Sequence, residues 1–210
     1  MRYFSGIRVD STKILTRSEL ATVLSDLNRK MVRSRNAWMN LILVRLSCCC
    51  GLRVSEIAGL RVSDVRCDPS RPHIRIRRGA SKGGKPRTVP LWWDAGTLAD
   101  LKRWKTERHA QTTDPNAPFI GSLIPTRPGT TLSRHTLRRR FRTACKVLGR
   151  ERLEVLTIHH GRHTFISHAL AGHRTLAEVR DAAGHANVSI TSAYLHIAVE
   201  DDAVGNLFRF

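Results

Sequence analysis

The 210-residue sequence lacks the features that membrane proteins and disulfide-rich proteins need. Its longest apolar stretch, residues 39–50, contains Arg45 and is far shorter than the roughly 20 residues of a membrane-spanning helix. The N-terminal residues contain no apolar region of the kind found in secretory signals. These absences predict a soluble cytoplasmic protein.

Cysteine is scarce and its spacing fits neither disulfides nor zinc. The five cysteines are odd in number and form no CxxC pair: Cys48, Cys49, Cys50, Cys67 and Cys145. This pattern argues against a disulfide framework and against a zinc ribbon. We expect the three adjacent cysteines to be small buried hydrophobic residues.

Acidic residues are also few. The chain has 36 Lys and Arg against 17 Asp and Glu, a formal net charge of +19, and 41% of its residues are hydrophobic. A chain of this length and hydrophobic content can bury a core and form one domain. The excess positive charge attracts polyanions, so nucleic acid is the expected partner.

The spacing of apolar residues predicts a mainly α fold with a small antiparallel β-sheet, an α+β class. Thr16 is suited to cap a first helix that contains Leu20, Val23, Leu24 and Leu27. Further helices are predicted at 37–50, 53–60, 94–109 and 133–148, then from about 159, at 175–183 and at 189–195. Residues 73–78 and 87–91 alternate like the strands of a β-hairpin around the turn 81–85. The proline-containing segment 111–130 is predicted to be a loop that buries Phe119 and Ile120.

Several polar motifs are distributed over these elements. Arg53 lies in GLRVSE, Lys82 in the turn SKGGKPR, His159 and Arg162 in HHGRH, and His185 in AGHAN, nine residues before Tyr194. In this order the set resembles the tyrosine recombinase family, the phage-type integrases, from about residue 16 to 202. The resemblance implies the catalytic set Arg53, Lys82, His159, Arg162, His185 and Tyr194. Glu56 and His196 also match positions of the family pattern.

The residue types suit the chemistry that the resemblance implies, which is cleavage and rejoining of DNA strands through a covalent 3′-phosphotyrosine. A tyrosine phenol conserves the energy of the phosphodiester bond, and two arginines can stabilise the phosphate oxygens without a metal. By resemblance, Tyr194 is the nucleophile, His159 its general base, Lys82 the general acid for the 5′-oxygen, and His185 a hydrogen-bond donor. No metal or nucleotide cofactor is implied.

Some assignments leave alternatives open. Lys85 could replace Lys82, and His160 could replace His159, although the His-x-x-Arg spacing to Arg162 favours His159. His159 and His163 also have a spacing seen in metal sites, but the glutamate of the HExxH pattern is missing.

Basic side chains outside the catalytic set are expected to contact DNA. On the predicted helix 133–148, Leu137, Phe141, Cys145 and Leu148 recur at helical spacing while basic residues line another face. The expected DNA-binding residues are Lys85, Arg87, Arg134, Arg138, Arg142 and Lys146. Contact with phosphates alone and contact with base edges in the major groove are both open for this helix.

The predicted boundaries are an N-terminal tail at 1–15, a catalytic domain at 16–202 and a C-terminal segment at 203–210. Most members of the family carry a further DNA-binding domain ahead of the catalytic one, so the chain resembles either a naturally short bacterial or phage-type member or a truncated one. Hydrophobic residues after Tyr194 are expected to dock on the same domain or on a neighbouring protomer. The resemblance implies double-stranded DNA as partner and a homotetramer, a pair of dimers, on DNA.

Two other functions compete with site-specific recombination. A type IB topoisomerase shares the phosphotyrosine chemistry but relaxes supercoils without a defined site. A non-catalytic DNA-binding relative would need no complete catalytic set, whereas all six residue types are present.

Overall fold

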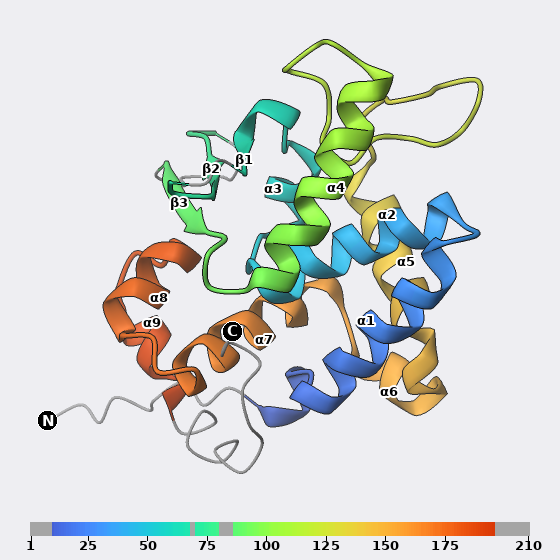
Figure 1. Ribbon diagram of the computed structural model, residues 1–210. Coiled ribbons are helices and arrows are strands. Elements are labelled where there is room, and N and C mark those ends of the chain that lie inside the picture. Colours follow the sequence, from blue (N-terminus) through green and yellow to red (C-terminus); the bar gives the residue numbers. More distant parts are fainter. Residues whose placement is uncertain (1–9, 68–69, 80–85, 196–210) are drawn as a thin grey trace, which may run out of the picture.

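The computed structural model describes residues 10–67, 70–79 and 86–195, and it confirms the predicted α+β class. Figure 1 shows the helices gathered around one body with a small sheet at its edge. The α-helices are α1 Arg17–Met31, α2 Arg35–Val44, α3 Val54–Ala58, α4 Ala95–Gln111, α5 Arg134–Ala144, α6 Arg150–Val155, α7 Ile158–Ala171, α8 Leu176–Ala183 and α9 Val188–Ser192. The strands are β1 Val65–Arg66, β2 His73–Ile76 and β3 Arg87–Pro90. Short 3-10 turns occupy Ser11–Lys13, Val62–Asp64 and Cys145–Leu148, and a π-helical turn occupies Arg45–Cys49.

The predicted helix starts agree with side-chain caps. Thr16 caps α1 in a capping box with Glu19, in which each side chain accepts a hydrogen bond from the other residue's backbone N–H. The side chains of Asp94 and Ser133 cap α4 and α5, each by accepting a hydrogen bond from a backbone N–H in the first turn of its helix. These caps fix where α1, α4 and α5 begin.

The main core lies between α1, α2, α3, α4, α5 and the sheet. Cys48, Cys49 and Cys50 are buried there, and burial raises the pKa of each thiol, so the prediction that they act as small hydrophobic residues is confirmed. Phe119 and Ile120 are buried as predicted. A smaller apolar cluster joins α7, α8 and the residues after α9, with Trp93 stacked on Phe165 at 6.0 Å between ring centroids.

The sheet has one strand more than the predicted hairpin. β2 pairs with β3 in antiparallel register, Ile74 opposite Val89, and the two-residue β1 adds Val65 opposite Ile74. β3 in turn packs against α8. The hairpin therefore connects the main core to the second cluster.

Other elements differ from the sequence-based expectation. The helix predicted at 37–50 begins at Arg35 and changes to a π-helical turn at Arg45, and the one predicted at 133–148 changes to a 3-10 turn at Cys145. Helix α6 was not predicted. Ile14 and Leu15, placed in the N-terminal tail by the sequence, are buried. The backbone N–H of Leu15 donates to Thr164 on α7 at 2.9 Å, so the folded part begins before Thr16.

Lys82, Lys85, His196 and the hydrophobic C-terminal residues lie outside the described residues. The predictions made for them remain predictions.

Gly51 connects the π-helical turn to α3 and has no room for a side chain. Its φ is +64°, and an added Cβ would lie 2.3 Å from Cδ1 of Phe165 on α7. Only glycine adopts this backbone conformation without strain and also allows α7 to approach so closely. The main core and the second cluster meet at this contact.

We predict that Gly51→Ala lowers the free energy of unfolding by about 2–5 kcal/mol, about 1–2 from the left-handed backbone and about 1–3 from overpacking. Gly79→Ala is the matched control, because Gly79 also has a positive φ, +87°, but nothing within 4 Å of an added Cβ. Urea denaturation of both variants tests this. Equal losses would show that Phe165 does not restrict the position.

Candidate active site

The C-terminal end of α8 is where three of the six predicted catalytic residues lie, namely Arg53, Arg162 and His185. Gly184 takes a left-handed conformation and ends the helix, leaving the last carbonyls without partners inside it. Three arginines bind successive carbonyls there. Arg87 donates from Nε to the carbonyl of residue 182 at 2.8 Å, Arg162 from Nη2 to that of residue 183, and Arg53 from Nη2 to that of Gly184 at 3.4 Å.

Glu56 holds two of these arginines. It lies on α3, is 1% exposed, and binds Arg87 through both carboxylate oxygens, at 2.7 and 2.8 Å. It also accepts from the backbone N–H of Arg53 at 2.8 Å and from its Nη1 at 3.1 Å. Burial by itself raises the pKa of Glu56, but the hydrogen bonds and charges of Arg87 and Arg53 outweigh it, so the pKa lies below its ordinary value. The carboxylate is therefore ionised at neutral pH.

Arg162 is the most buried of the three arginines, at 3% exposed. Its Nη1 donates to the carbonyl of Gly51 at 2.8 Å, so its guanidinium spans from the end of the π-helical turn to the end of α8. Burial and the neighbouring charges of Arg53 and Arg87 lower its pKa. The charge of Glu56 acts in the opposite direction on the pKa of Arg162. The cluster thus retains positive charge that an anion would offset.

His185 follows Gly184 directly and faces the same cluster. Its Nδ1 pairs with the hydroxyl of Thr191 on α9 at 2.9 Å, which fixes the ring. Burial, followed by the charges of Arg162 and Arg53, lowers its pKa to about 4. The imidazole is neutral at pH 7, so one of its nitrogens carries a hydrogen and the other is free to accept.

Tyr194 lies just beyond α9 and is 4% exposed. Its hydroxyl forms a short hydrogen bond with Nδ1 of His163, and the two rings stack with centroids 5.6 Å apart. Burial raises the pKa of Tyr194 to about 12, although the charge of Arg162 acts in the opposite direction. The phenol is therefore protonated at neutral pH and needs a base in order to react.

The two adjacent histidines of the HHGRH motif have different surroundings. His160 accepts the backbone N–H of Thr157 on Nδ1 at 3.2 Å and so caps α7. His159 is more exposed, and its pKa is lowered by partial burial and by the charges of Arg162 and Arg53. Its proximity to these charges places His159 beside the arginine cluster.

Sequence spacing suggested only one role for His163, that of a zinc ligand. Within the described residues, however, no group of three or more His, Cys, Asp or Glu side chains is arranged to hold a metal ion. The hydrogen bond to Tyr194 could not be anticipated from spacing, because it depends on how the turn after α9 packs on α7. Sequence reasoning therefore missed the contact between His163 and Tyr194.

Arg87 was expected to contact DNA, and the structure gives it a different set of partners. Its side chain is 8% exposed and its guanidinium is engaged by Glu56 and α8. Arg87 lies two residues before the buried Val89 and shares its face of β3, so only its positive charge favoured a contact with DNA. Contact with DNA stays a prediction for Arg87, whereas its contacts within the protein position Glu56.

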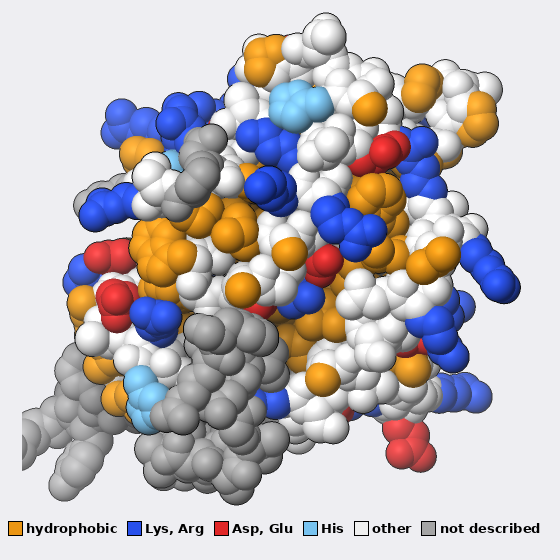
Figure 2. Space-filling model, in the orientation of Figure 1, with side chains coloured by type: hydrophobic (Ala, Val, Ile, Leu, Met, Phe, Trp, Pro, Cys, Tyr) orange, Lys and Arg blue, Asp and Glu red, His pale blue; other side chains and the backbone are white. Residues whose placement is uncertain are grey.

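The basic helix has the predicted two faces. Leu137, Phe141 and Cys145 are buried, while the side chains of Arg134, Arg138, Arg142 and Lys146 are exposed. None of these four cations forms an ion pair with an acid in the part of the chain that the structure describes. Figure 2 shows that Lys and Arg side chains are spread over the visible face, with fewer acidic ones.

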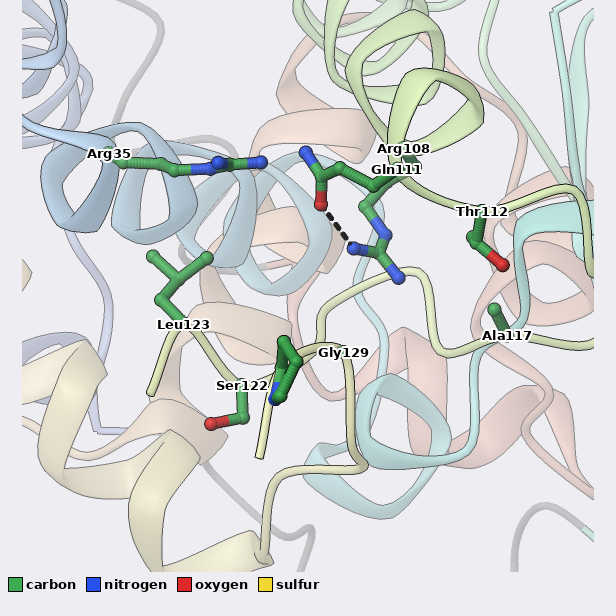
Figure 3. Close-up of a pocket in the computed structure, with 9 residues that line it drawn as sticks. Arg35, Arg108, Gln111, Thr112, Ala117, Ser122, Leu123 and Gly129 are labelled. Atoms are coloured by element: carbon green, nitrogen blue, oxygen red, sulfur yellow. Dashed lines mark hydrogen bonds between the residues drawn. The ribbon is translucent and has the colours of Figure 1, made fainter. Parts of the chain in front are cut away.

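The cavity drawn in Figure 3, of about 480 Å³, lies away from the catalytic candidates. It is lined by the end of α4, the start of α2 and the loop before α5. Arg108 is buried there and donates to Gln111 at 2.6 Å, and Arg35 at the rim binds Glu107 at 2.7 Å. None of the predicted catalytic residues lines this cavity.

No helix within the described residues has the length and apolar character to cross a membrane.

We predict that Glu56→Gln lowers the free energy of unfolding by about 3–5 kcal/mol, because it leaves the buried guanidinium of Arg87 without a counter-charge. Glu154→Gln is the control, since Glu154 forms only an exposed ion pair with Arg150 and its loss costs about 0–1 kcal/mol. Chemical denaturation at pH 7 measures both. A Glu56→Gln variant as stable as the control would contradict the role given to this carboxylate.

Comparison with known proteins identifies the family of the chain. The model of the phage integrase family matches residues 13–201. A tyrosine recombinase of Pseudothermotoga lettingae is 31% identical over 208 residues, which cover 97% of this chain and 65% of that protein.

Two solved structures have the same fold at 22% identity. The XerA recombinase has a TM-score of 0.71 over 95% of this chain and 64% of its own. The XerH site-specific recombinase, bound to a palindromic difH substrate in a post-cleavage complex, has a TM-score of 0.69 over 95% of this chain and 55% of its own. The chain thus spans just over half to about two thirds of the length of these relatives. Since the family model covers nearly all of it, the chain belongs to the phage integrase family of tyrosine recombinases.

Proposed function

We propose that the chain cleaves and rejoins DNA strands at specific sites through a covalent 3′-phosphotyrosine on Tyr194. The observation that carries the proposal is the position of the Tyr194 phenol, hydrogen-bonded to a histidine and within the electrostatic influence of Arg162. A nucleophile, a base and fixed cations within one cluster are the parts that phosphoryl transfer needs.

The scissile phosphate would bind between Arg53 and Arg162. Arginine offers paired donors that stay charged at any physiological pH and match phosphate oxygens. Arg53 is 33% exposed and can reach a ligand, while Arg162 is fixed from behind by two carbonyls. A phosphate there would offset the positive charge that Glu56 leaves uncompensated. Charge developing on the non-bridging oxygens would then be stabilised without a metal.

The other groups complete the reaction. His185, neutral and fixed by Thr191, would donate a hydrogen bond to a phosphate oxygen. His159 would assist the tyrosine as general base, and Lys82, outside the described residues, would protonate the departing 5′-oxygen. These roles are carried over from the family resemblance, residue by residue.

Double-stranded DNA is the proposed substrate and α5 part of the surface that binds it. The exposed row of Arg134, Arg138, Arg142 and Lys146 would neutralise backbone phosphates, and a homotetramer would assemble on the DNA. The XerH structures contain difH DNA, and a dimeric lambda integrase of the same fold is bound to a core site, which supports this proposal.

We expect the chain to form a covalent adduct with a nicked suicide DNA substrate that carries its recombination site, because the cleaved fragment diffuses away and leaves the phosphotyrosine trapped. Tyr194→Phe removes the nucleophilic oxygen and should abolish the adduct while leaving DNA binding intact. Denaturing gel electrophoresis detects the adduct. No adduct with wild type, or an adduct that persists in Tyr194→Phe, would contradict the proposal.

We expect Arg138→Gln to weaken DNA binding similarly on all sequences and to reduce the slope of log K against log salt by about 1, because one phosphate contact is lost. Arg150→Gln is the control, as Arg150 is also highly exposed but lies on α6. Fluorescence anisotropy at several salt concentrations measures the slopes. If both variants keep the wild-type slope, α5 does not contact phosphates.

A further inference from the structure

We propose that His163, in place of the His159 to which the family resemblance gives this role, accepts the phenolic proton of Tyr194 when the phosphotyrosine forms. This inference rests on the proposed function and assigns a role to a residue outside the catalytic set that the sequence predicted.

The geometry favours His163 over His159. The Tyr194 hydroxyl is already hydrogen-bonded to Nδ1 of His163, and the stacked rings restrict both side chains. The ring of His159 packs edge-on against that of His163, with centroids 5.0 Å apart and planes at 87°. Among the described atoms, no hydrogen bond joins His159 to Tyr194. A general base must lie within hydrogen-bond distance of the proton that it removes, and His163 meets this condition in the free protein.

The proton balance of the step is simple. Neutral His163 carries its hydrogen on Nε2 and leaves the Nδ1 lone pair for the phenol. As the phenolic oxygen forms its bond to phosphorus, its proton passes to Nδ1 and the bond between phosphorus and the 5′-oxygen breaks. The departing oxygen takes a proton from the general acid. In rejoining, the 5′-hydroxyl attacks phosphorus and returns its proton to the general acid, while the bond from phosphorus to the tyrosine oxygen breaks and that oxygen recovers its proton from the His163 imidazolium.

The charges around His163 couple this transfer to DNA. Burial, then His159, His160 and Arg162 on α7 and Lys13 before α1, lower the pKa of His163 to about 4. His185, from the segment after α8, faces it as well. Because the pKa of Tyr194 is about 12, the proton stays on the phenol in the free protein.

A phosphodiester held by Arg53 and Arg162 brings a negative charge into this surplus of cations. It favours the protonated imidazole and raises the pKa of His163. The base therefore becomes effective only when a phosphate is in place. This protects the free protein from premature ionisation of its nucleophile.

The test is single-turnover cleavage of a suicide substrate by His163→Asn and His163→Gln, which keep polar atoms near Nδ1 but cannot take up a proton. We expect both variants to fold and bind DNA like wild type and to cleave about 10²–10⁴ times more slowly. The wild-type rate should fall at acidic pH as His163 becomes protonated in the complex, and this acidic limb should disappear in the variants. His173→Asn is the control, because His173 is exposed after α7 and has a φ of 62°, which asparagine tolerates.

A substrate with sulfur in place of the bridging 5′-oxygen separates the base from the acid, since its leaving group needs no proton. It should restore cleavage to a Lys82→Ala variant but not to His163→Asn. Wild-type rates in both His163 variants, with loss of the acidic limb in His159→Asn instead, would overturn the inference while leaving the proposed function standing. Absence of an adduct with wild type would contradict the proposed function itself.

Discussion

The end of α8 is the constraint on which the rest of the site depends. A helix of eight residues ends at a left-handed glycine, and its last carbonyls accept hydrogen bonds from Arg87, Arg162 and Arg53. These arginines come from β3, α7 and the start of α3, which are far apart in the sequence. The negative end of the helix dipole favours cations at this position. One helix terminus therefore brings the sheet, the main core and the second cluster to a single place.

This arrangement leaves the cluster ready for an anion. Glu56 compensates part of the positive charge, and the burial of Arg162 makes the remainder costly in the absence of a ligand. In the proposed function, a phosphate diester supplies the missing charge beside Tyr194 and its histidine partner. The basic residues form two structural groups. A few arginines are fixed inside the protein by carbonyls and by Glu56, and others, such as those of α5, are exposed, where we propose that they meet the DNA backbone.

Much of this could be predicted from the sequence, and the limits have physical causes. Caps such as Thr16 predicted where helices start. Motifs whose order resembles a family identified Arg53, His159, Arg162, His185 and Tyr194. The internal role of Arg87 was not readable, because its partners Glu56 and α8 approach it only through tertiary packing. The hydrogen bond between His163 and Tyr194, which are 31 residues apart, depends in the same way on how the turn after α9 meets α7. Local patterns specify residue types and helix ends, whereas contacts between distant elements appear only in the fold.

The arrangement of the site is tested most directly by a crystal structure of the Tyr194→Phe protein bound to an uncleaved DNA site. We expect non-bridging oxygens of one phosphate to lie about 2.7–2.9 Å from guanidinium nitrogens of Arg53 and Arg162, with the ring of residue 194 next to that phosphorus and His163 beside it. We also expect both arginines to keep their contacts with the end of α8. A scissile phosphate bound elsewhere, with Arg162 still enclosed by protein carbonyls alone, would show that these arginines do not bind it.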